Sequence, residues 1–345
     1  ARMVIASPAV CALRALHRVA PGLPFDDARL LQAGAAVADA LRTLFNNPET
    51  VVLLRGRGNE PRYWRLVLQH AINGNLQAVL DEQCHVLVES LGVAELEPRE
   101  RVEKIAEEIG RALGIRTALL KVDDIVVRDD AVTIRPYRIR CRFALRLGDL
   151  KDDDGKEIAR ADVVRAAFNS PFRPFVLATT SIGQEGLDFH TWCHAVVHWN
   201  LPTNPVDLEQ REGRVHRYKG HAVRKNVARK LGLRTLADVW DRSGDPWAAL
   251  FEEARRTRPR GSNDLVPYWI YETEGGATIE RRIPMLAFSR ENSRLGRLRR
   301  GLALYRLAFG QPRQEDLLGH LDSMRGVDAK WVSDCHVSLQ PPRLL

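Results

Sequence analysis

An apolar run that leads into a glycine-containing loop is the feature that most constrains this sequence. Residues 175–190 are FVLATTSIGQEGLDFH, in which a carboxylate lies on each side of Gly186. A strand needed only for burial would end in ordinary turn residues. Here the run ends in hydroxyl side chains, and glycine lets the following backbone approach a ligand closely. The stretch therefore predicts a buried strand followed by a ligand-binding loop.

The segments around this loop predict an α/β fold. Residues 124–147 alternate β-branched and basic residues, with Asp129-Asp130 as a hairpin turn, and residues 159–170 have a helical pattern. After the loop, a second apolar run, AVVHWNLP at 195–202, is followed by a helical pattern that begins near Asp207. This order of elements, from about 138 to 220, predicts a parallel sheet with crossover helices.

A second segment, QREGRVHR at 210–217, supplies arginines that would face the same ligand. Loops at the carboxyl ends of parallel strands gather at one edge of the sheet and form the ligand site. On a helix, Arg214 and Arg217 are three residues apart and share a face. Guanidinium groups beside a glycine loop suit a phosphate, because arginine binds phosphate through paired hydrogen bonds. The two segments together predict a phosphate site.

Both segments resemble motifs of superfamily 2 helicases and translocases. TTSIGQEGLDFH resembles motif V, and QREGRVHR resembles motif VI, whose pattern is QxxGRxxR. The stretch HWNLPTNPVDLEQREGRVHRYKG, at 198–220, is most similar to the Swi/Snf branch, particularly the bacterial RapA/HepA-like proteins. The resemblance covers about residues 138–230, which correspond to the second RecA-like domain of these enzymes.

The resemblance implies roles for the matching residues. The residues facing the nucleic-acid backbone would be Thr179, Thr180 and Ser181. The ATP-binding residues would be Gly183, Glu185, Gly186 and Asp188. The catalytic residues would be Gln210, Arg214 and Arg217. Gln210 would couple the two ligand faces, and the arginines would stabilise charge on the transferred phosphoryl group. ATP and Mg²⁺ are the implied cofactors, with Mg²⁺ held mainly by a first RecA-like domain.

The phosphate-cradling loop of an ATPase is missing from the sequence, since no GxxxxGK[ST] pattern occurs in it. LQAVLDEQCH, at 76–85, contains the DExxH-like letters of a Walker B strand, but only residues 78–80 form an apolar run before Asp81. Its apolar spacing is helical, so we expect an exposed turn of helix. The chain also begins with Ala rather than Met. We therefore expect the C-terminal half of a larger enzyme, unable to hydrolyse ATP alone.

The function expected is that of the C-terminal motor half of an ATP-dependent translocase or helicase, acting on double-stranded DNA as the Swi/Snf resemblance implies. Two alternatives stay open: a helicase-like domain that binds nucleic acid or a protein partner without turnover, and an RNA helicase of the same superfamily. The net charge of +8 suits a polyanionic partner. Arg224 and Lys225 would bind phosphates of the track strand, or would belong to a solvated helix face.

Three domains are expected. Residues 1–135 form a mainly helical block, 136–231 form the RecA-like domain with motifs V and VI, and 232–345 form an α-rich accessory region. The helical patterns between 27 and 125 contain no group of residues typical of a catalytic or binding site. This block could therefore bind duplex nucleic acid, bind a protein partner, or have a packing role alone. The fold class expected is α/β, with a RecA-like parallel sheet between the helical block and the accessory region.

Histidines near the loop raise the alternative of a metal site. His190, His194 and His198 lie at four-residue steps around Cys193, which on a helix would suit zinc. On a strand these steps span about 13 Å each, so we expect no metal there. The five cysteines are scattered and form no CxxC pair, which suits a reducing compartment. No apolar run approaches the roughly 20 residues of a membrane helix, so we expect a cytoplasmic protein.

Overall fold

The computed structural model describes ten stretches of the chain: residues 2–57, 60–114, 118–128, 131–141, 157–172, 174–179, 188–241, 244–285, 289–307 and 313–323. The chain divides into two compact units, Ala1–Leu187 and Asp188–Leu345, which we call the N-terminal and C-terminal units. The division falls at the end of the predicted motif V loop. This division does not test the three domain bounds expected from the sequence, which stay a prediction.

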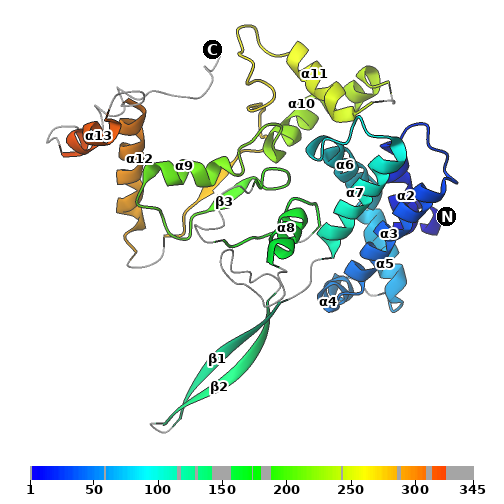
Figure 1. The fold of residues 1–345 in the computed structure, drawn as a ribbon, viewed down its shortest axis with the longest axis horizontal. Coiled ribbons are helices and arrows are strands. Elements are labelled where there is room, and N and C mark those ends of the chain that lie inside the picture. The colour runs from blue at the N-terminus through cyan, green and yellow to red at the C-terminus, as the bar shows by residue number, and fades with distance from the viewer. Residues whose placement is uncertain are drawn as a thin grey trace. The chain divides into compact units, whose positions relative to one another are not determined.

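The N-terminal unit is built mainly from helices (Figure 1). They are α1 (Arg2–Ala6), α2 (Pro8–Arg18), α3 (Ala28–Phe45), α4 (Pro48–Arg57), α5 (Tyr63–Asn73), α6 (Leu76–Ser90), α7 (Pro98–Leu113) and α8 (Glu157–Phe168). The helical patterns of the sequence are thus confirmed. α4 contains the apolar run VVLL at 51–54.

The core of this unit lies between α2, α3, α6 and α7. Its largest fully buried side chains include Leu16, Leu30, Leu41, Leu80 and Ile105. The buried positions on α3 recur at three- and four-residue steps, so one stripe of the helix faces the core. Asp27 caps this helix, since its Oδ1 accepts hydrogen bonds from the backbone N–H groups of Arg29 at 3.0 Å and Leu30 at 3.2 Å.

The DEQCH segment lies within α6, so the helical prediction is confirmed. The prediction that this turn is exposed is wrong. Gln83 is 1% exposed, and Cys84 and His85 are also buried. Burial raises the pKa of the Cys84 thiol. Asp81 forms an ion pair with Arg18 of α2. The segment therefore serves the helical core, where its side chains pack against neighbouring helices.

A two-stranded antiparallel hairpin follows the helices. β1 (Ala118–Arg128) pairs with β2 (Ala131–Cys141), with Ile125 opposite Ile134 and Val127 opposite Val132. The change to a strand pattern near residue 124 is thus confirmed, although β1 begins six residues earlier. The predicted turn Asp129-Asp130 lies outside the described residues. Figure 1 shows the hairpin extending away from the neighbouring helices.

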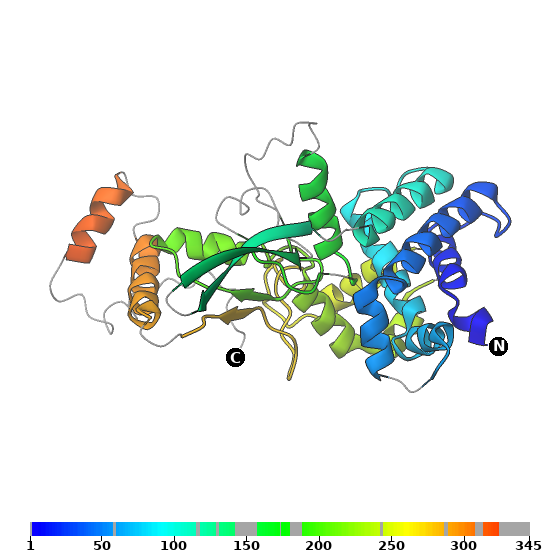
Figure 2. The ribbon, with the colours of Figure 1, turned by 90° about the horizontal axis from the view of Figure 1, so that it is seen from below.

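The C-terminal unit combines helices with a small parallel sheet. Its elements are β3 (Ala195–Val197), α9 (Pro205–Gly213), α10 (His221–Val239), α11 (Pro246–Arg256), β4 (Glu280–Arg282), α12 (Glu291–Leu307) and α13 (Gln314–Ser323). β3 pairs with β4 in parallel, with Ala195 opposite Glu280. α12 crosses α9 in Figures 1 and 2. The contact buries Leu208 and Leu298 in one cluster with Leu201.

The sheet differs from the expected one. The described part of the predicted strand, residues 174–179, is irregular, and the AVVHWNLP run forms a strand only at 195–197. The partner of that strand, β4, comes from the predicted accessory region. Among the described residues the α/β mixture is present, with one parallel pair. The complete RecA-like sheet stays a prediction, because residues 142–156 and 180–187 lie outside the described part.

The core of the N-terminal unit can be tested on α3. Leu41 is 0% exposed, so Leu41→Ala should lower the free energy of unfolding by about 2–5 kcal/mol. Leu31, on the same helix, is 46% exposed, and Leu31→Ala should change this free energy by less than about 0.5 kcal/mol. Urea denaturation followed by circular dichroism measures both. Equal losses would contradict the assignment of the buried face.

Candidate nucleotide and nucleic-acid site

The predicted motif V loop is only partly described. Thr179 is exposed at the end of one described stretch, and Asp188 begins the next. The predicted residues Thr180, Ser181, Gly183, Glu185 and Gly186 lie outside the described residues. Their roles therefore stay predictions. The described part of the candidate site begins at Asp188 and lies within the C-terminal unit.

Helix α9 carries the first half of motif VI. Asn204 caps it by accepting a hydrogen bond from the N–H of Val206 at 2.9 Å, and Pro205 occupies the first helical position. Leu208 is buried, whereas Gln210 is exposed. Arg211 donates from Nη1 to the carbonyl of Asn200 at 3.0 Å, which ties α9 to the segment after β3. Gln210 is therefore accessible from outside the unit, and Arg211 has a positioning contact.

Helix α9 ends at Gly213, before the second motif VI arginine. Arg214 is the C-cap, and Arg217 lies in the irregular turn that follows. The expectation that Arg214 and Arg217 share one face of a helix is therefore wrong. Gly213 lies at the end of the helix, where glycine is commonly found. Residues 188–190 contact both arginines, through the carbonyl of Arg214 and the side chain of Arg217.

Three contacts join the end of the motif V segment to motif VI. The N–H of Phe189 donates to the carbonyl of Arg214 at 2.8 Å, and the N–H of His221 donates to the carbonyl of His190 at 2.9 Å. Between them, Arg217 donates from Nε to Oδ1 of Asp188 at 3.0 Å. The side chains of Arg217 and Asp188 are 38% and 49% exposed. The structure thus brings together Asp188 and Arg217, as the sequence predicted for one site.

Glu212 organises the polar contacts beneath this turn. Its Oε1 lies 3.1 Å from Nε2 of His198, and Arg281 donates to its two oxygens at 2.5 and 2.6 Å. Burial alone would raise the pKa of Glu212, but the hydrogen bonds and charges of His198 and Arg281 lower it to about 2. These contacts link α9 to the segment after β3 and to β4. The signal for Glu212 in the sequence is that it is the single acidic residue between positions 211 and 230.

Residues of the predicted accessory region contact the turn that carries Arg217. His216 Nε2 lies 3.0 Å from the carbonyl of Trp269, and the N–H of Lys219 donates to the carbonyl of Tyr268 at 2.7 Å. The rings of Tyr218 and Tyr268 stack at 5.5 Å. Lys219 has a φ of 47°, and its Nζ lies over the Tyr218 ring. The turn is therefore held on both sides, by residues 188–190 and by residues 268–269.

Arg224 and Lys225 occupy different environments. Arg224 is 6% exposed and donates to the carbonyls of Thr191 at 2.5 Å and Lys219 at 3.0 Å. Its guanidinium also lies over the rings of Trp192 and Trp247. This burial is incompatible with the surface phosphate contact expected from the sequence, because the guanidinium is packed inside the unit. Lys225 is exposed and stays a candidate for such a contact.

The histidines near the loop have separate surroundings. His198 contacts Glu212, and His194 lies 3.9 Å from Glu280 and 5.7 Å, between ring centroids, from His221. Burial, with the nearby charges of Arg224, Lys225 and His194, lowers the pKa of His221 to about 4, so it is neutral at pH 7. Within the described stretches, no group of three or more His, Cys, Asp or Glu side chains could hold a metal ion.

The Glu212 contacts predict a pH dependence of stability. Because the folded-state pKa lies below the ordinary value of 4.5, ionised Glu212 stabilises the fold above pH 4.5. This stabilisation is lost as the pH falls from 4.5 toward 2. Glu212→Gln should lower the free energy of unfolding at pH 7 by on the order of 2–3 kcal/mol and weaken this acid dependence.

Denaturant unfolding across the pH range measures this effect. Glu274→Gln is the matched control, because Glu274 is exposed in the same unit. A Glu212→Gln profile that coincides with the profile of the unchanged protein would show that the carboxylate is not stabilising.

Comparisons with known proteins bear on one region of the chain. No curated protein and no solved structure matches it. None of the described helices is long and apolar enough to cross a membrane. One family model matches, that of the helicase conserved C-terminal domain, over residues 153–219. This range includes the loop, β3, α9 and motif VI. The match covers less than half of the chain and indicates a helicase C-terminal-like segment at residues 153–219.

Proposed function

We propose that the chain is the C-terminal motor half of an ATP-dependent translocase of the Swi/Snf-like branch, acting on double-stranded DNA. It contributes motif V and the motif VI arginines to an ATP site shared with a first RecA-like domain. The contact between Arg217 and Asp188 carries the proposal, together with the backbone bonds that frame it. These bonds bring one residue of motif V and one of motif VI to the same surface.

The Arg217 side chain suits a phosphate. An exposed ion pair contributes little stability, typically 0–1 kcal/mol by order of magnitude, so about that much is lost when Arg217 leaves Asp188. A phosphate offers several charged oxygens in the geometry that a guanidinium binds best. In the proposed cycle, Arg217 exchanges Asp188 for phosphate oxygens and stabilises the charge that develops on them. Arg214, half-buried at the end of α9, adds a second positive charge nearby.

ATP, when bound with Mg²⁺, supplies the phosphoryl group that is transferred to water. The proposed nucleotide contacts in this chain are Gly183, Glu185, Gly186 and Asp188. The phosphate-cradling loop and most Mg²⁺ ligands belong, in this proposal, to the first RecA-like domain, since no GxxxxGK[ST] pattern occurs in the sequence. The exposed Gln210 would transmit nucleotide binding toward Thr179, Thr180 and Ser181 on the nucleic-acid side.

Nucleic acid would also meet the exposed basic face of α10. Lys225, Arg229, Lys230 and Arg234 are all exposed there. Among the described residues, no carboxylate forms an ion pair with them. Such charges attract the phosphate backbone whatever the sequence of the nucleic acid. Two alternative functions are a domain that binds nucleic acid or a protein partner without ATP turnover, and an RNA-directed helicase. The experiments below distinguish the proposed translocase from both.

The arginine role is tested in the longest natural polypeptide that contains these residues. Arg217→Ala should lower nucleic-acid-stimulated ATP hydrolysis by about a thousandfold, because a charge that stabilises the transition state is lost. Nucleotide binding should be largely retained. Arg299→Ala, which removes an exposed arginine of α12, is the control and should hydrolyse ATP nearly as well as the unchanged protein. Unchanged turnover in Arg217→Ala would contradict the role, and stimulation by RNA rather than duplex DNA would contradict the substrate.

The two neighbouring basic residues should behave differently. Lys225→Gln should weaken DNA binding and reduce the slope of log affinity against log salt by about 1, because one phosphate contact is lost. Arg224→Leu should instead lower stability, because the carbonyls of Thr191 and Lys219 lose their donor. Binding titrations at several salt concentrations and thermal unfolding measure both. A normal salt slope in Lys225→Gln would leave this residue as ordinary surface.

A further inference from the structure

A cavity with a volume of about 630 Å³ lies within the C-terminal unit. Cavities of about 300–1,000 Å³ are typical of small-molecule sites. Its walls come from α10, from the loop after α11 and from residues 269–279, with Glu212 and His216 at the motif VI end. Arg217 and Asp188 do not line it. The nucleotide contacts proposed above therefore leave this cavity without a role.

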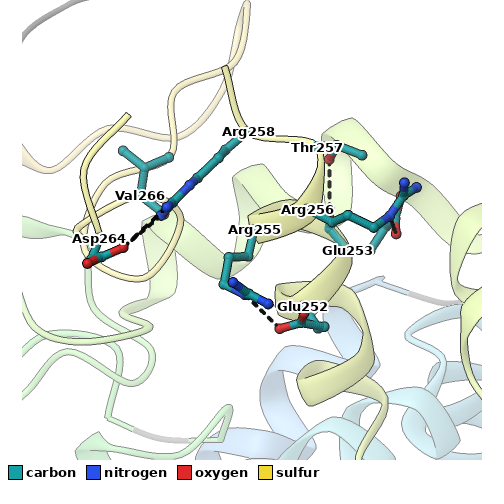
Figure 3. A network of polar contacts seen from close by, with 8 residues as sticks. All are labelled: Glu252, Glu253, Arg255, Arg256, Thr257, Arg258, Asp264 and Val266. Carbon is teal, nitrogen blue, oxygen red and sulfur yellow. Dashed lines mark hydrogen bonds and ion pairs between the residues drawn. The ribbon is translucent and has the colours of Figure 1, made fainter. Parts of the chain in front are cut away.

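Hydrogen bonds join the segments that form the walls of the cavity. Asn226, on α10, donates to the carbonyls of Tyr271 at 2.7 Å and Ala277 at 2.9 Å and accepts from the N–H of Ala277 at 2.6 Å. In the loop after α11, Arg258 donates to the carbonyl of Val266, which lines the cavity, at 3.0 Å and to Asp264 at 3.2 Å (Figure 3). The cavity is thus preformed, which reduces the entropic cost of binding.

Neighbouring arginines are neutralised within α11, as Figure 3 also shows: Arg255 pairs with Glu252 and Arg256 with Glu253. The segment 254–261 is therefore a poor candidate for the main phosphate contact near the cavity. Lys230 is the better one. It lines the cavity and is exposed, and no carboxylate of the described residues forms an ion pair with it.

Aromatic groups and one buried hydroxyl give the cavity its chemistry. Trp269 lines it and is 36% exposed, so part of the indole is accessible. Tyr271 is 5% exposed, and its hydroxyl is buried without a hydrogen-bond partner among the described residues. Such a group costs free energy unless a ligand atom satisfies it. Nζ of Lys230 lies 5.1 Å from the centre of the Tyr271 ring, at the same wall.

We propose that this cavity binds a nucleobase, with the attached phosphate at Lys230. A planar base can stack on the Trp269 indole, as bases stack on aromatic side chains of proteins that bind single strands. Its polar edge can satisfy the Tyr271 hydroxyl, and Glu272, which also lines the cavity, can accept from an exocyclic amine. The base belongs either to a free nucleotide or to a single strand. The proposal does not depend on ATP hydrolysis by this chain.

The test is direct binding to the full chain of two probes: free nucleoside monophosphates, followed by ligand-observed NMR, and an end-labelled single-stranded oligonucleotide, followed by fluorescence anisotropy. Trp269→Leu should weaken binding about fivefold or more, since one stacked base is lost. Tyr271→Phe, which removes only the hydroxyl, should weaken it less. Trp64→Leu is the control, because Trp64 is an exposed tryptophan of the N-terminal unit.

Lys230→Gln changes an exposed side chain and keeps the proposal testable if Trp269→Leu does not fold. It should weaken binding of both probes more than Arg299→Gln does, which removes an exposed charge of α12. If both probes bind and the cavity variants weaken the binding of both, the result supports a site for free nucleotides. If the cavity variants weaken the binding of the oligonucleotide alone, the result supports a site for a strand. If neither probe binds, the proposal is overturned. Equal effects of the cavity variants and their controls would also overturn it.

Discussion

The charged hydrogen bonds at Glu212 are the interaction on which the candidate site depends. They join three segments that are distant in sequence: His198 after β3, Glu212 near the end of α9, and Arg281 on β4. Hydrogen bonds to an ionised carboxylate are stronger than neutral ones, and removing one partner would leave the others poorly solvated. The motif VI turn begins directly after Glu212. The contacts of Glu212 therefore help to fix the position of the turn that carries Arg217.

In the C-terminal unit, residues of the predicted accessory region contact the segment that matches the helicase C-terminal domain. β4 supplies the parallel partner of β3, and the carbonyls of Tyr268 and Trp269 hold the turn around Arg217. The predicted boundary at residue 231 falls within α10, which continues to Val239 with a non-helical φ at Gly232. The match to the helicase C-terminal domain ends at residue 219, yet the contacts that fix motif VI extend to residue 282. These contacts explain how a short motif could keep a defined geometry.

Local sequence patterns predicted the helices well and the tertiary contacts only in part. The α3 and α7 stripes were predictable because helix periodicity follows burial on one face. The pairing of motif V with motif VI came from a resemblance, and the structure brings Asp188 to Arg217. The burial of Arg224 could not be predicted, because it depends on Trp247, which lies 23 positions further along the sequence. The helix end at Gly213 was not predicted, because the three-residue spacing of Arg214 and Arg217 favoured a continuing helix.

We propose that the ATP site is shared between this chain and a first RecA-like domain. The first measurement to make compares nucleic-acid-stimulated ATP hydrolysis by residues 1–345 with hydrolysis by a polypeptide extended upstream through the natural gene. We expect turnover in the extended polypeptide and none in residues 1–345, although these residues should still bind nucleic acid. Turnover by residues 1–345 alone would contradict a shared site. Absence of turnover in both, with nucleic acid bound, would contradict the motor role and favour a binding domain.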